Sequence, residues 1–402
     1  MRRYLPLLIA MLLMAGCARR ETQSPVAVPA GGAAPAPVAV TPSDGTEPPT
    51  AAIEITGPLG RNDPSTLTMD ELAEGMRTFV TDRPLERLKV LYDRWYPTGW
   101  RPAVLEADLN GDGAAEVITA PRVWGEKRPM TGAGTLIVIN QTDGGWTAER
   151  LPGEEVQGIF LYEVADLAGD RLPEIVWGSA MSGAHTAHHK VFVSQWTPGA
   201  FTTLPGRMEM ASMQLEVTGH DLVLHGGMIG SVGAGPQRAW TDRYRWTGAE
   251  FALIDRRYDQ GDWGYWRLVD GVTHERFGRL TDAEKAYRDV LDPQRVVAPP
   301  DAVDERGAGN FAEAVRAAAR LRLTAMLLGQ NGRAPEAAVL VEGATGPYAD
   351  LLRATLPASS GDEACRLGAA WAAEHPVFIE ALNGLFGYAN KIWTSENLCG
   401  MP

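Results

Sequence analysis

The stretch "EADLNGDGAAEV", residues 106–117, decides how this 402-residue chain folds. Its oxygen-bearing side chains alternate with small residues, at relative positions 1, 3, 5 and 9: Asp108, Asn110, Asp112 and Glu116. Alternate residues of a tight loop point inward, and calcium takes six to eight oxygen ligands. The carbonyl of Ala114, at position 7, offers another oxygen. The loop is therefore a candidate calcium site; the alternative is a solvated acidic turn without an ion.

The residues that follow the loop distinguish it from an EF-hand. Position 12 is Thr119, whereas an EF-hand requires a bidentate acid there. The next residues, "EVITAP", are rich in β-branched side chains and predict a strand rather than a helix. The sequence therefore predicts a metal-binding loop within a β-hairpin.

The same pattern occurs again further along the chain. Residues 166–176, "DLAGDRLPEIV", align without a gap with residues 108–118, "DLNGDGAAEVI", and a second strand and a turn follow each copy. A third copy, beginning with "LEVTGHDLVLHGGMIG" at residues 215–230, keeps the strands and glycines but has lost the acidic loop. Repeats of several short strands predict propeller blades or stacked hairpins. Three copies are too few for a closed propeller, so other strands complete it or the sheet stays open.

Residues 100–258 resemble the FG-GAP or VCBS repeat family, the blades of integrin-α-like β-propellers, through the loop pattern D-x-[DN]-G-D-G-x-x-[DE]. The resemblance implies a calcium ion that pins the hairpin of the first blade. Its ligands would be Asp108, Asn110, Asp112, Glu116 and the carbonyl of Ala114. In the second copy Asp166, Asp170 and Glu174 match the pattern. Ala168 and Arg171 depart from it, so we expect a degenerate metal loop whose arginine neutralises the acids.

The N-terminus predicts export. Residues 1–16 contain Arg2, Arg3 and an apolar run too short to span a bilayer, as in a signal peptide. "LMAGC" resembles a bacterial lipobox, although Met14 replaces the usual leucine; the resemblance implies cleavage before Cys17 and acylation of its thiol and amine, for example with palmitate. Ordinary signal cleavage and twin-arginine export stay open. Residues 17–56, rich in proline and alanine, predict a disordered tether. We expect a protein lipid-anchored to a bacterial membrane, facing the periplasm or the cell exterior.

The cysteine count agrees with export. An exported chain with three cysteines has one to explain, and lipid on Cys17 leaves Cys365 and Cys399 as a candidate disulfide. The alternative is two free buried thiols.

Helices are predicted on both sides of the β-repeats. Residues 57–99 form a short helical segment, with Thr68 as an N-cap and Leu72, Met76 and Phe79 on one face. In the second of its helices, Leu85 and Leu88 begin the apolar face. Nothing in this segment suggests chemistry.

Residues 259–402 predict an α-helical domain, rich in alanine, leucine and arginine. The spacing of Gly271, Gly278, Ala283, Tyr287 and Pro293 resembles a tetratricopeptide repeat, and looser units follow around Gly332 and Ala364. The resemblance implies stacked helix pairs with a concave surface; a generic helical bundle is the alternative. We expect residues 376–393 to form a capping helix. The fold class is therefore multidomain β + α: an antiparallel β-repeat domain, propeller-like and partial, followed by a tetratricopeptide-like domain.

Composition and motifs limit the function. The net charge of −13, with no basic stripe, argues against a nucleic-acid partner. No zincin, nucleophile-elbow, C-x-x-C or P-loop motif is present. The sequence also lacks the two-lobed α/β alternation of solute-binding proteins. We expect a non-enzymatic, calcium-stabilised interaction or scaffold module for a protein or glycan partner.

The alternative is an extracytoplasmic enzyme or enzyme subunit with a site across the β-repeat loops. Its candidate residues lie in "SGAHTAHHK", which contains His185, His188 and His189. Histidine is the commonest zinc ligand, but no acid or cysteine nearby in the sequence completes a tetrahedral set. A polar loop between two strands is the simpler interpretation.

Overall fold

The structure is a computed structural model that describes residues 53–60, 66–80, 83–96, 102–123, 133–142, 145–151, 158–183, 185–303, 310–390 and 392–399. The predicted signal peptide, Cys17 and most of the predicted tether lie outside the described residues. Residues 53–402 form one compact unit. No helix in the described ranges has the length and apolarity needed to cross a bilayer.

Two helices precede the sheets, as predicted: α1 (Met69–Phe79) and α2 (Pro84–Trp95), after the short 3₁₀ turn η1 (Gly57–Gly60). Thr68 caps α1 with a complete capping box, because its hydroxyl accepts the Glu71 N–H while the Glu71 carboxylate accepts the Thr68 N–H. The predicted apolar face of α1 is buried. Leu85 departs from the prediction for α2: it is 45% exposed, whereas Leu88 is buried.

The predicted tether extends a few residues too far. Ile53 and Ile55 pack against the apolar cluster formed by α1, α2 and the first sheet. Large β-branched side chains in an otherwise small-residue segment can bury apolar surface, so the folded part begins before residue 57.

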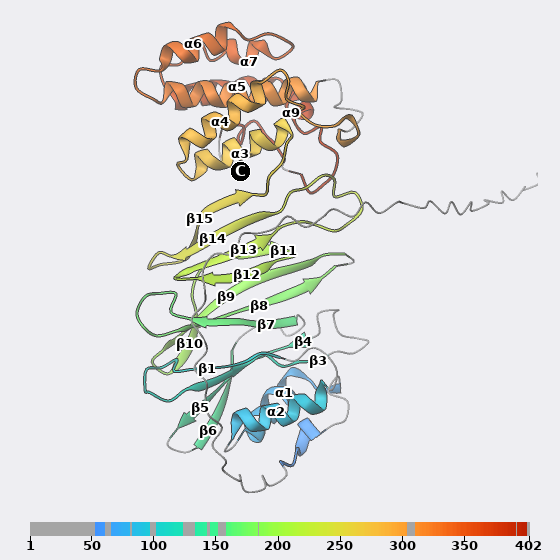
Figure 1. The fold of residues 1–402 in the computed structure, drawn as a ribbon, viewed down its shortest axis with the longest axis vertical. Helices are drawn as coiled ribbons and strands as arrows, with labels where there is room; N and C mark the ends of the chain where they lie inside the picture. The colour runs from blue at the N-terminus through green and yellow to red at the C-terminus, as the bar shows by residue number, and fades with distance from the viewer. Residues whose placement is uncertain are drawn as a thin grey trace, which may run out of the picture. The chain divides into compact units, whose positions relative to one another are not determined.

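The strands form three main antiparallel sheets, one for each sequence repeat (Figure 1). The first has the order β1 (Val104–Ala107), β2 (Glu116–Thr119), β5 (Leu136–Thr142), β6 (Gly145–Leu151), with β3 (Arg122–Val123) and β4 (Ala133–Gly134) as a separate pair. The second has β7 (Gly158–Ala165), β8 (Glu174–Ser182), β9 (Ala187–Thr197) and β10 (Ala200–Thr203), and β11 (Met208–Ala211) also pairs with β9. The third has β12 (Gln214–Thr218), β13 (Asp221–Gly226), β14 (Trp240–Trp246) and β15 (Phe251–Tyr258). The prediction of antiparallel β-repeats followed by helices is confirmed.

Alternating strand residues pack these sheets face to face. In β5, Val138 belongs to an apolar cluster shared with Trp177 of β8, whereas Ile137 and Ile139 face α1 and α2. Val176, the residue before Trp177 in β8, belongs to the apolar cluster shared with the third sheet. Each strand thus serves two cores because successive side chains point to opposite faces. The described strands do not close into a barrel or propeller; instead, helices cover the outer face of the first sheet.

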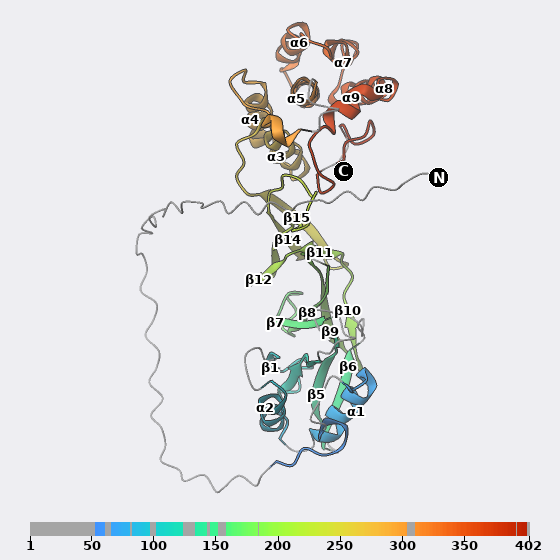
Figure 2. The ribbon, with the colours of Figure 1, turned by 90° about the vertical axis from the view of Figure 1, so that its right-hand side faces the viewer.

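The C-terminal part is helical: α3 (Gly264–Arg276), α4 (Leu280–Leu291), the 3₁₀ turn η3 (Pro300–Ala302), α5 (Phe311–Leu328), α6 (Ala334–Glu342), α7 (Ala349–Arg353), α8 (Gly361–Glu374) and α9 (Pro376–Leu382). The long helix α5 lies at the centre and contacts the other helices of this part (Figure 2). Gly271 of α3 faces the ring of Tyr287 in α4, where a Cβ would lie 2.3 Å from the ring. The glycine therefore lets these two helices approach closely, as the repeat pattern predicts.

The predicted capping helix over residues 376–393 is wrong beyond its first turns. The helix α9 ends at Leu382, and the chain then turns back on itself. Asn383 holds this turn, because its side-chain amide bonds both the N–H and the carbonyl of Trp393. Gly387 has φ +107°, a conformation that a helix excludes.

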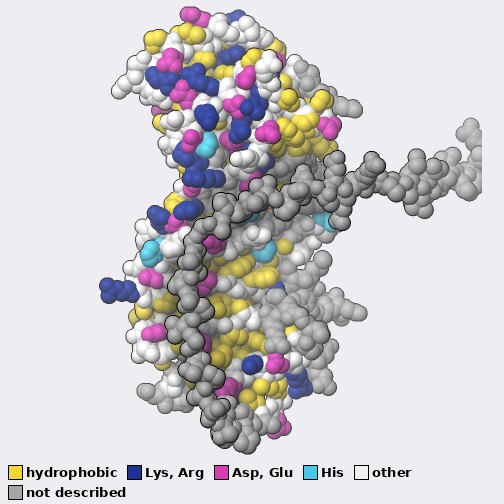
Figure 3. Space-filling model, viewed as in Figure 1, with side chains coloured by type: hydrophobic (Ala, Val, Ile, Leu, Met, Phe, Trp, Pro, Cys, Tyr) yellow, Lys and Arg dark blue, Asp and Glu magenta, His cyan; other side chains and the backbone are white. Residues whose placement is uncertain are grey.

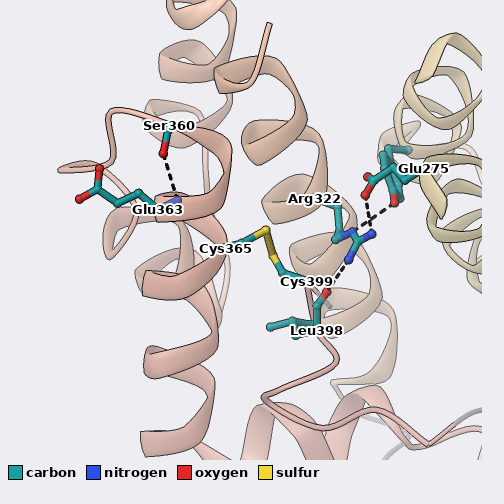
Figure 4. The surroundings of a disulfide bond; sticks show 8 residues. Glu275, Arg322, Ser360, Glu363, Cys365, Leu398 and Cys399 are labelled. Carbon is teal, nitrogen blue, oxygen red and sulfur yellow. Dashed lines mark hydrogen bonds and ion pairs between the residues drawn. A yellow bond between two sulfur atoms is a disulfide. The ribbon is translucent and has the colours of Figure 1, made fainter. Parts of the chain in front are cut away.

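The predicted disulfide between Cys365 and Cys399 is confirmed, with a Cα–Cα distance of 5.3 Å. It joins α8 to the C-terminal segment (Figure 4). Beside it, Arg322 of α5 donates to the Leu398 carbonyl at 3.3 Å and forms an ion pair with Glu275 of α3. The segment is thus held by a covalent bond and by a buried arginine.

Candidate functional site

The first acidic loop connects β1 to β2 and is closed by its own side chains. Asp108 accepts the N–H groups of Gly111 (2.7 Å) and Gly113 (2.9 Å). Asn110 and Asp112 each accept the N–H two residues further on. Gly111 and Gly113 have φ of +78° and +86°, which explains the glycines of the motif.

Glu116, the first residue of β2, anchors the base of this loop. Its side chain is buried and accepts the Leu109 N–H at 2.7 Å and the Asn110 amide at 3.1 Å. Burial raises the pKa of Glu116, and the nearby charges of Asp112 and Asp108 raise it further. None of these three acids forms an ion pair with the described residues. Negative charge therefore accumulates in one short turn without a basic side chain to balance it.

The second acidic loop, between β7 and β8, repeats this geometry with two departures. Glu174 accepts the N–H groups of Leu167 and Ala168 through one oxygen, while its other oxygen, Oε1, is buried without a partner among the described residues. Arg171 has φ +76° where the first loop has Gly113. The expectation that this arginine neutralises the acids is wrong in the described structure: its backbone N–H bonds Asp166, and its exposed side chain forms no ion pair there.

The third repeat also has a buried acid at the start of a strand, but there arginines balance its charge. The sequence repeat did not reveal this acid. Asp221 is the first residue of β13, as Glu116 is of β2 and Glu174 is of β8, and all three are buried. Asp221 accepts hydrogen bonds from Arg245 at 2.6 Å and Arg243 at 3.2 Å. The bond from Arg245 lowers the pKa of Asp221. Here arginines supply the positive charge that the first loop lacks.

The loops contact one another in sequence order. Leu172 of the second loop packs on Gly111 of the first, where a Cβ would lie 3.1 Å from the leucine. His220, in the short turn before β13, donates its Nδ1–H to the Asp166 carbonyl at 2.7 Å. The corresponding turns of the three repeats therefore lie beside one another at one edge of the sheets.

The donors of the first loop fit a hard cation such as calcium. Asp108, Asn110, Asp112 and Glu116 supply carboxylate and amide oxygens within one short loop, and an oxygen that accepts one N–H keeps a second lone pair. Within the described ranges, however, no group of three or more histidine, cysteine, aspartate or glutamate side chains is arranged to hold a metal ion. The calcium site therefore stays a prediction.

The three histidines of the middle repeat lie along β9 and just before it. His185 and His188 are exposed. His189 is half-buried beside Phe160, within 3.2 Å of the Tyr162 hydroxyl, and burial lowers its pKa. Its partner is thus a tyrosine of the same sheet, and the described structure gathers no metal-binding group around these residues.

The helical part contains a charged groove that the sequence analysis did not identify. A cavity of about 600 Å³ along α3 and α4 adjoins one of about 260 Å³ at the end of β15, and the two share Arg267, Asp270, His274 and Asp282. Acidic and basic side chains alternate over these helices (Figure 3). The spacing of residues 267, 270 and 274 places them on one helix face, a polar stripe that could have been found from sequence.

Two arginines fix residues that line this groove. Arg238, with its side chain 5% exposed, lies between the rings of Tyr258 (4.9 Å) and Trp266 (4.8 Å) and donates to Asp270 at 2.8 Å. This contact joins the third sheet to α3. One helical turn from Asp270, the Arg279 Nε–H donates to His274 Nδ1 at 2.9 Å. Burial lowers the pKa of His274, and the Arg279 charge lowers it further.

The groove can therefore bind a polar partner through rigid, alternating charges. Its ion pairs are already formed, so a partner must offer complementary hydrogen bonds rather than a single net charge.

Comparisons of the chain with protein-family models, with characterised proteins and with solved structures find no match.

Proposed function

We propose that this protein is an exported lipoprotein, anchored to a bacterial membrane through Cys17, whose calcium-stabilised body is an interaction module for a protein or glycan partner. The observation that carries the proposal is the charged groove along α3, with walls fixed by Arg238 and Arg279. A preformed polar surface of this kind loses little conformational entropy on binding.

Two features support the remaining parts of the proposal. The uncompensated acids of the first loop suit calcium, and their position between paired strands makes the ion structural, as the FG-GAP resemblance implies. The disulfide suits an oxidising compartment outside the cytoplasm.

Crosslinking in cells tests the interaction. A photoreactive amino acid replaces Lys285, an exposed residue that lines the groove, and in the control it replaces Lys89, an exposed residue of α2. We expect a discrete protein or glycan adduct from position 285 only, identified by mass spectrometry. Equal adduct patterns at both positions, or none at 285, would contradict the proposed role of the groove.

Labelling with a radioactive palmitate analogue tests the anchor separately. The full chain should incorporate label, and a Cys17→Ser variant should not. Label retained by the variant would show that Cys17 is not the acylated residue.

A further inference from the structure

A second cavity of the helical part shares no lining residue with the charged groove. Its volume is about 270 Å³, and it is formed by α5, the end of α4 and the connection between α6 and α7. The polar side chains in its wall include Arg316 and Arg320 of α5, which are one helical turn apart, and Tyr348. Leu291 and Leu352 supply apolar wall.

This cavity carries an excess of positive charge. Glu313 is the carboxylate in its lining, and it is committed to Arg316 at 3.1 Å. Arg320 is half-buried and forms no ion pair or hydrogen bond with the described residues. Burial lowers the pKa of Arg320; the nearby Arg316 charge also lowers it, while Glu313 opposes this change. The cavity lining thus contains two guanidinium groups and one carboxylate, and that carboxylate pairs with Arg316.

Two further donors around the cavity lack acceptors. The hydroxyl of Tyr348 and the Nε–H of Arg316 are both buried, and neither has a hydrogen-bond partner in the described part of the chain. The Tyr348 ring is fixed by an edge-to-face contact with Phe378, at 5.0 Å between centroids. Buried donors are satisfied in most proteins, so unpaired donors beside an unpaired cation indicate a missing acceptor.

We propose that this cavity binds one oxyanion group, a carboxylate or a phosphate, of a small ligand. Arg320 pairs with the anion, since a guanidinium presents two N–H groups to two oxygens of such a group. Tyr348 donates its hydroxyl to the same ligand. Leu291 and Leu352 contact the apolar part of the ligand.

Calorimetric titration of the full chain, solubilised in detergent, tests this site. The probes are inorganic phosphate, acetate and butyrate at constant ionic strength. We expect one saturable site for at least one probe; phosphate binding alone indicates a phosphate ligand, and stronger binding of butyrate than of acetate indicates a carboxylate with an apolar tail.

Three variants make the test specific. Arg320→Met should weaken binding by about tenfold or more, because it removes a charged hydrogen-bond donor. Tyr348→Phe keeps the ring and should weaken binding several-fold without loss of stability, which covers the case in which Arg320→Met does not fold. Arg353→Met is the matched control, since Arg353 is exposed and pairs with Asp350 on α7. No saturable binding of any probe, or equal binding to wild type and Tyr348→Phe, would overturn the proposal.

Discussion

Removal of the Cys365–Cys399 disulfide is expected to destabilise the helical part by about 3.8 kcal/mol. The two cysteines are 34 residues apart, and in the chain-entropy model the conformational entropy that the unfolded chain gains when this loop is opened gives this value. The double variant Cys365→Ser, Cys399→Ser makes the change with little effect on packing, because both side chains are only half-buried.

The variant should nevertheless fold. Trp393 and Leu398 of the C-terminal segment are buried, and Arg322 still donates to the Leu398 carbonyl. These contacts keep the segment docked after the covalent bond is lost, so the loss appears as lower stability and not as a missing element.

Hydrogen exchange of the α8 amides measures the effect locally, because a chain of this size need not unfold in a two-state manner. The free energy of opening α8 should fall by about 3–4 kcal/mol in the variant. A reductant should produce the same change in the wild type and none in the variant. A difference below about 0.5 kcal/mol between wild type and variant would show that the disulfide does not stabilise the helical part. An effect of that size is typical of a neutral surface substitution.

Three further predictions concern the packing and charge of the sheets. Trp177→Ala should destabilise the protein by about 3–5 kcal/mol, because the indole fills the core between the first two sheets. Chemical denaturation measures this loss of stability, and a loss under about 1 kcal/mol would contradict the face-to-face packing. Without calcium, stability should fall as pH rises from about 4.5 through the raised pKa values of Glu116 and Glu174, because the folded state holds these protons more tightly than the unfolded chain. Melting temperatures between pH 4.5 and 7.5 check this, and a Glu116→Gln, Glu174→Gln variant should lose that part of the slope; an unchanged slope would reject the assignment. Gly235→Ala should lower the melting temperature, since its Cβ would lie 1.9 Å from the Phe386 carbonyl oxygen. An unchanged melting temperature would show that the loop between β13 and β14 does not contact the turn after α9.

The repeats could be predicted from sequence because the acidic loops mark the same point of each hairpin. Asp108 and Asp166 precede β2 and β8, whose consecutive apolar residues fill cores on both faces of their sheets. The capping box at Thr68 and the glycine contact at Gly271 were predictable for the same reason: each depends on residues close in sequence or at helical spacing.

What could not be predicted depends on contacts between distant residues. The pairing of Asp221 with Arg245 follows from strand register, which the shortened third loop conceals. The position of Arg238 between two aromatic rings requires the sheet and α3 to meet. The end of α9 is set by Asn383 folding back on a residue ten positions away, a contact that competes with continued helix.

The calcium-dependent melting temperature of residues 53–402 tests whether the first acidic loop holds a structural calcium ion. Asp112→Ala removes one proposed ligand, and Asp350→Ala, an exposed acid on α7, is the matched control. At a calcium concentration about 100 times its dissociation constant, binding should stabilise the wild type and the control by about 2.7 kcal/mol relative to chelator.

We expect calcium to raise the melting temperature of wild type and Asp350→Ala but not of Asp112→Ala. In chelator, Asp112→Ala should melt close to the wild type, because the relief of repulsion from Glu116 offsets the lost hydrogen bond from the Ala114 N–H. Equal melting temperatures with calcium and with chelator in the wild type would contradict the claim that the first acidic loop holds a structural calcium ion.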